Sequence, residues 1–154
     1  MSIRKQENLL SRRKMTLVLA TVQAALLIFG SNSVSANECK KSAKQLRGNF
    51  EVTQSSGGIW GFLEKSTSLK DKSVLGLQID SKLQRAVLSF ENKCEAPNAV
   101  PDTALFQTIG GFLDKSQKLN GKSADTIPAA QLLAEIQDMI KSLDEFLATV
   151  EKQP

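Results

Sequence analysis

The chain has 154 residues, with 20 lysines and arginines, 16 aspartates and glutamates, two cysteines and no histidine. The lack of histidine excludes Ser-His-Asp and Cys-His nucleophiles and any histidine-ligated metal site. The net charge of +4 would be typical of a basic protein, but its distribution along the chain changes that interpretation.

The N-terminal residues have the three parts of a secretory signal peptide: a basic segment, an apolar run over 15–30 and small residues up to Ala36. The apolar run is shorter than the roughly 20 residues that cross a bilayer as a helix. We therefore expect 1–36 to be cleaved, leaving a single domain of residues 37–154. The expected location is periplasmic or secreted, without stable membrane insertion after cleavage; an uncleaved anchor is the alternative.

The leader carries the excess charge. Residues 1–36 contain five basic side chains and one acidic side chain, so residues 37–154 contain 15 of each. Within this neutral part, 37–85 has a net charge of +4 and 86–154 a net charge of −4. The basic footprint of a nucleic-acid-binding protein is absent, and we expect no nucleic-acid partner. We interpret the uneven charge as solvated helix surface rather than as a device that steers a partner.

Cys39 and Cys94 predict one disulfide, because exported proteins with two cysteines usually pair them. They lack the CxxC spacing of a redox pair. In a plain up-down-up bundle, however, Cys39 would start one helix and Cys94 would end a parallel one, about 25 Å away. A disulfide needs Cα atoms within about 7 Å. Either the short helix between them crosses obliquely, so that the long helices run antiparallel, or the pair is not bonded; we expect the oblique short helix.

Helical periodicity covers the rest of the chain. Apolar residues recur at intervals of three and four in five segments, namely 39–54, 59–69, 75–94, 105–119 and 129–150. The breaks at 55–58, 95–104 and 120–128 contain glycine, proline or asparagine. The sequence therefore predicts an all-α fold, a small bundle of about five helices with one disulfide.

The last of these segments has the clearest pattern. Its apolar stripe follows a four-three spacing, with three further residues widening it: Ala129, Leu133, Ile136, Ile140, Leu143, Leu147 and Val150, then Leu132, Met139 and Phe146. The opposite face is mainly acidic, whereas helices that lie on membranes prefer lysine and arginine there. We therefore expect this helix to pack within the bundle.

An internal repeat is the most specific signal. Residues 59–73 and 109–123 align without a gap and are identical at nine of 15 positions. A longer helical pattern follows each copy. The sequence thus predicts a unit of short helix, turn and long helix, used twice, at about 57–95 and 107–152.

The repeat also supplies the candidate binding residues. A duplicated contact surface would use Trp60 or the equivalent pair Lys65 and Lys115; the alternative, which we favour, is a duplicated packing motif. Gly61 and Gly111 cost up to about 1 kcal/mol each in a helix. They indicate a close helix–helix contact or a late helix start.

The sequence assigns no residue to catalysis, to a metal or to a cofactor. Carboxylate pairs such as Glu135/Asp138 and Asp144/Glu145 lie on the polar face of the last helix. We expect a non-enzymatic protein that binds an unknown protein partner through one face of the bundle. The alternatives are a carrier of a small apolar ligand in the bundle core, between the repeats, and, less favoured, a carboxylate-based enzyme.

Overall fold

The computed structural model describes residues 31–151, and the statements below concern that range. It contains five α-helices and two short 3-10 turns: α2 Ser31–Ser55, α3 Gly58–Glu64, η1 Lys70–Lys72, α4 Ser73–Cys94, α5 Thr103–Asn120, η2 Ala124–Thr126 and α6 Ala129–Val150. No strand occurs between residues 31 and 151, and the all-α prediction is confirmed. The expected leader lies outside the described residues up to residue 30; residues 31–36 form the start of α2.

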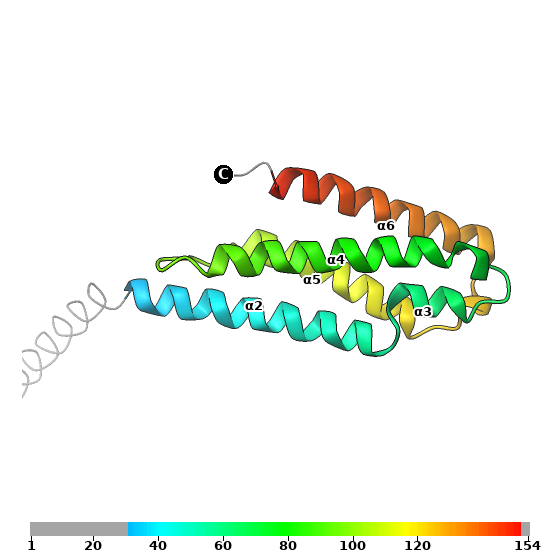
Figure 1. Ribbon diagram of the computed structural model, residues 1–154, viewed down its shortest axis with the longest axis horizontal. Coiled ribbons are helices and arrows are strands. Elements are labelled where there is room, and N and C mark those ends of the chain that lie inside the picture. Colours follow the sequence, from blue (N-terminus) through cyan, green and yellow to red (C-terminus); the bar gives the residue numbers. More distant parts are fainter. Residues whose placement is uncertain (1–30, 152–154) are drawn as a thin grey trace, which may run out of the picture.

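Four long helices run alternately in opposite directions (Figure 1). Helix α4 packs between α2 and α6, and α5 packs against α2 and α4. The short α3 lies at one end of the bundle and packs mainly on α4. The long helices thus form an up-down-up-down bundle in which α4 has neighbours on most of its sides.

The expected disulfide between Cys39 and Cys94 is confirmed, with the two Cα atoms 5.2 Å apart. Helix α3 continues in the general direction of α2 (Figure 1), so the chain reverses only where α4 begins. Helices α2 and α4 therefore run antiparallel, and the end of α4 lies beside the N-terminal half of α2. Both cysteines are buried.

The hydrophobic core follows the expected stripes except in α6. Leu132 and Met139, which we had placed at the edge of the stripe, are fully buried. Leu133 and Ile140, which we had placed at its centre, are only half-buried. The four-three spacing therefore misplaced the centre of this stripe, because apolar residues flank it on both sides and periodicity alone does not choose between them.

The junction of α3 with α4 is built from two residues one turn apart. A Cβ on Gly76 would overlap the backbone of Ile59 and Trp60, so only glycine lets the two helices approach this closely. Asp80 then accepts hydrogen bonds from the N–H groups of Ile59 and Trp60, each 3.1 Å long. The α4 carboxylate thus serves as the N-terminal cap of α3. Gly57, with a φ of 97°, makes the turn that precedes this helix.

The two copies of the repeat adopt different structures. Copy two, up to Asn120, lies inside the continuous helix α5, which starts early because Asp102 accepts a hydrogen bond from the N–H of Leu105 at 2.9 Å. In copy one, α3 ends at Glu64 and the Oγ of Ser66 accepts the N–H of Leu69. Poor helix formers, Thr67 and Ser68, stand where copy two has glutamine and lysine. The first copy therefore forms a short helix and a turn, as expected, and the second forms the end of a long helix.

Candidate functional site

The structure places the three candidate binding residues in different surroundings. Trp60 is 42% exposed on α3. Lys65 is exposed just after α3. Lys115, its equivalent in the repeat, forms an ion pair with Asp138 of α6, with Nζ 3.6 Å from Oδ2. The two lysines therefore differ in environment, although their local sequences match.

Large apolar side chains are exposed on α4, which the sequence analysis did not single out. Val74 is 61% exposed, Leu77 51% and Leu88 38%. Leu77 and Leu88 are eleven residues apart, which is about three helical turns, so they lie on one face. Val74 lies nearly one turn before Leu77. Gly76 lies close to the backbone of Trp60, so Trp60 lies beside the first turn of α4.

We call Trp60, Val74, Leu77 and Leu88 the α3–α4 apolar surface. One signal in the sequence could have found it. Helix α4 carries more apolar residues than a single core stripe needs, and the excess falls outside the periodic positions. A helix that is apolar on a second face has that face either covered by a neighbour or exposed to a partner.

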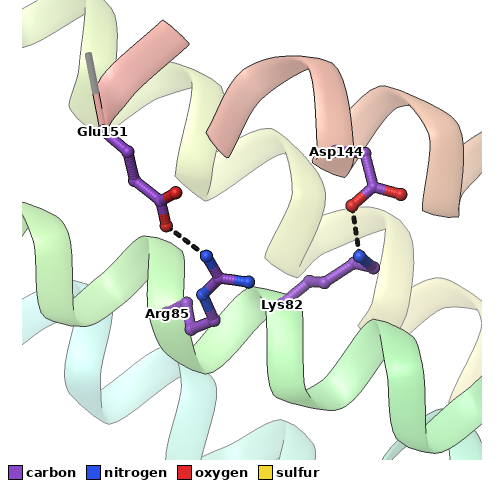
Figure 2. Close-up of polar contacts among 4 residues, drawn as sticks. All are labelled: Lys82, Arg85, Asp144 and Glu151. Atoms are coloured by element: carbon purple, nitrogen blue, oxygen red, sulfur yellow. Dashed lines mark hydrogen bonds and ion pairs between the residues drawn. The ribbon is translucent and has the colours of Figure 1, made fainter. Parts of the chain in front are cut away.

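Two ion pairs join α4 to α6 beside this surface (Figure 2). Lys82 pairs with Asp144, and Arg85 pairs with Glu151. Exposed pairs of this kind contribute at most about 1 kcal/mol each, but they hold the cationic side chains toward α6. A shallow pocket of about 290 Å³ lies here, lined by Val74, Leu77, Gln78, Ser81, Lys82 and Arg85.

The opposite end of the bundle has a groove of about 520 Å³ along α2, next to the disulfide. It is lined by Lys40, Ala43, Lys44, Arg47, Glu91, Cys94 and Glu95. The Nε of Arg47 donates to Glu91 at 2.8 Å, and this hydrogen bond raises the pKa of Arg47. Because two glutamates lie among the three basic side chains, the groove has mixed charge.

The carboxylates of the described residues have structural or surface roles. Asp80 is the buried carboxylate among the described residues. Its burial raises its pKa, although the hydrogen bonds that it accepts from the N–H groups of Ile59 and Trp60 act in the opposite direction. On α6, Asp138, Asp144 and Glu145 pair with lysines at the surface. Residues 31–151 contain no group of three or more histidine, cysteine or acidic side chains placed to hold a metal ion.

Comparison of the chain with protein-family models, characterised proteins and solved structures finds no match. Within residues 31–151, no helix has both the length and the apolar character needed to cross a membrane.

Proposed function

We propose that this chain is an exported, non-enzymatic protein that binds another protein through the α3–α4 apolar surface. The observation that carries the proposal is the exposure of Val74 and Leu77 on a helix whose other sides are packed. The partner that fits is an apolar segment, such as one face of an amphipathic helix, lying along α4.

The disulfide supports the proposed compartment. Disulfides persist in the periplasm and outside the cell, whereas the cytosol keeps most thiols reduced. Cys39 and Cys94 are bonded and buried, which suits a structural crosslink rather than a redox exchange. The signal-like segment before residue 37 supports the same location.

The composition of the surface supports binding. Tryptophan is enriched among the residues that dominate binding energy at interfaces, and Trp60 is 42% exposed. Burying an apolar side chain contributes about 25 cal/mol per Å² removed from water. Val74 and Leu77 thus supply the apolar centre of a small interface, with Lys82 and Arg85 at its polar edge.

Site-specific photocrosslinking in the native envelope tests this proposal. A photoreactive amino acid replaces Leu77 in one strain and Trp60 in a second. The matched control replaces Gln107, an exposed residue of α5. We expect one protein adduct of the same mass from positions 77 and 60, and none from position 107.

A second variant ties the adduct to the apolar surface. Val74→Glu puts a charge one turn from Leu77, and we expect it to reduce the adduct at least about tenfold while helicity by circular dichroism stays unchanged. Equal adducts from all three positions, or an adduct that survives Val74→Glu undiminished, would contradict the proposed surface.

A further inference from the structure

A separate pocket of about 200 Å³ lies between the two copies of the repeat. Its lining is Ser56, Phe62, Lys65, Asn120, Lys122, Ser123 and Ala124. Phe62 and Lys65 come from copy one, and Asn120, Lys122 and Ser123 come from copy two. The pocket therefore exists only because the fold brings the two copies together at the end of the bundle that holds α3.

Hydrogen bonds between distant segments hold the walls of this pocket. Asp125 Oδ1 accepts the N–H and the hydroxyl of Thr67, both at 3.0 Å, and the hydroxyl of Ser66 at 3.2 Å. These bonds fasten the loop after α3 to the loop after α5. The amide of Asn120 donates to the Oγ of Ser56 at 3.4 Å, which joins the end of α5 to the end of α2.

The two lysines of the pocket differ from their equivalents elsewhere in the repeat. Lys115, which corresponds to Lys65, pairs with Asp138. Lys72, which corresponds to Lys122, pairs with Asp71, with Nζ 2.9 Å from Oδ2. Within residues 31–151, no carboxylate lies within ion-pair distance of Lys65 or Lys122.

The nearby carboxylate of Asp125 does not line the pocket. Its Oδ1 is occupied by the three donors from Ser66 and Thr67, and the donors from Thr67 lower the pKa of Asp125. Its charge is therefore partly satisfied by groups outside the pocket. The pocket lining consists of two lysines without a carboxylate partner, the polar side chains of Ser56, Asn120 and Ser123, and the apolar side chains of Phe62 and Ala124.

We propose that this pocket binds a small phosphate-type anion, either inorganic phosphate or a small phosphomonoester. Lysine acts as a point charge on phosphate oxygens, and a hydroxyl supplies a further donor. A volume of about 200 Å³ corresponds to roughly six or seven water molecules at about 30 Å³ each, which leaves room for a phosphate and a short organic group. This site lies on residues other than those of the α3–α4 apolar surface and does not depend on the proposed function.

The test is a titration of the ¹⁵N-labelled protein, with the disulfide intact, with inorganic phosphate at constant ionic strength, followed by NMR. We expect saturable shifts of the amides of Lys122, Ser123 and Ala124. Lys65→Met and Lys122→Met should each weaken binding about tenfold, because each removes one charge-assisted contact. Ser123→Ala should weaken it less.

The repeat supplies matched controls. Lys115→Met and Lys72→Met remove the same charge from nearly the same local sequence but lie outside the pocket, and we expect both to leave the affinity unchanged. Parallel titrations with glycerol phosphate and with vesicles of phosphatidic acid distinguish a free phosphomonoester from a lipid headgroup. Leu77→Glu should have no effect on phosphate binding.

Two results would overturn the proposal. The first is the lack of saturable shifts with inorganic phosphate and with glycerol phosphate up to millimolar concentrations. The second is an equal loss of affinity in the pocket variants and in Lys115→Met and Lys72→Met, which would show attraction by net charge alone.

Discussion

Asp80 determines how α3 is attached to the bundle. Its carboxylate is buried and accepts the first N–H groups of α3, which have no partner within that helix. A helix of only seven residues is marginal without tertiary contacts. The position of Trp60, and with it part of the α3–α4 apolar surface, therefore depends on this one side chain from the following helix.

We expect Asp80→Ala to lower the free energy of unfolding by about 2 kcal/mol, because it leaves the N–H groups of Ile59 and Trp60 without an acceptor. Asp80→Asn keeps one acceptor oxygen and should cost less. Urea denaturation of both variants, followed by circular dichroism and tryptophan fluorescence, measures the two losses. An Asp80→Ala protein as stable as the original would show that the cap contributes nothing.

The pH dependence of this residue has a definite sign. Burial raises the pKa of Asp80, so the folded protein holds this proton more tightly than the unfolded chain does. Its contribution to stability is fully present below the unfolded pKa of about 3.9 and is lost as pH rises through the folded pKa. The stability difference between the original protein and Asp80→Asn should therefore shrink as pH rises from about 4 and then stay level. A difference that grows with pH would contradict this assignment.

At the scale of the helices, two glycines respond in opposite ways to the same substitution. Gly111 lies inside α5, and a Cβ there would meet no neighbouring atom. We expect Gly111→Ala to stabilise the protein by about 0.5–1 kcal/mol through helix propensity. Gly76→Ala should instead destabilise it by about 1–3 kcal/mol, because α3 must move away from α4. Thermal unfolding of the two variants checks both signs; equal shifts would mean that the α3–α4 approach is not tight.

The sequence predicted the number of helices and most of their extents, because a periodic apolar stripe reports on the face that a helix buries. It did not predict the role of Gly76 or the role of Asp80. Gly61 and Gly111 were expected to mark close contacts or late helix starts, whereas Gly111 is exposed in mid-helix. Close approach depends on which helices meet, and local spacing carries no information about that.

The same limit applies to the repeat. Nine identities in 15 residues predicted two equivalent units, but the early start of α5 at Asp102 and the poor helix formers Thr67 and Ser68 give the copies different structures. The pocket between them combines residues more than 50 positions apart in sequence. Neither it nor the exposed face of α4 follows from local periodicity.

At the scale of the whole molecule, the disulfide closes a loop that contains most of α2 and all of α3 and α4. It spans 55 residues and joins the N-terminal half of α2 to the last residue of α4. The chain-entropy model gives such a crosslink about 4 kcal/mol of stability.

We expect the double variant Cys39→Ala/Cys94→Ala to unfold at a markedly lower urea concentration than the original protein. A reducing agent should lower the midpoint of the original protein and leave the double variant unchanged; an original protein insensitive to reductant would contradict this role.

Intact-mass spectrometry of the protein recovered from its native cells tests most directly whether it is exported and closed by its cysteines. The expected species begins at Asn37, weighs two hydrogens less than the reduced chain, and reacts with a thiol-alkylating reagent only after reduction. A full-length species beginning at Met1 whose two thiols are alkylated without reduction would contradict the account.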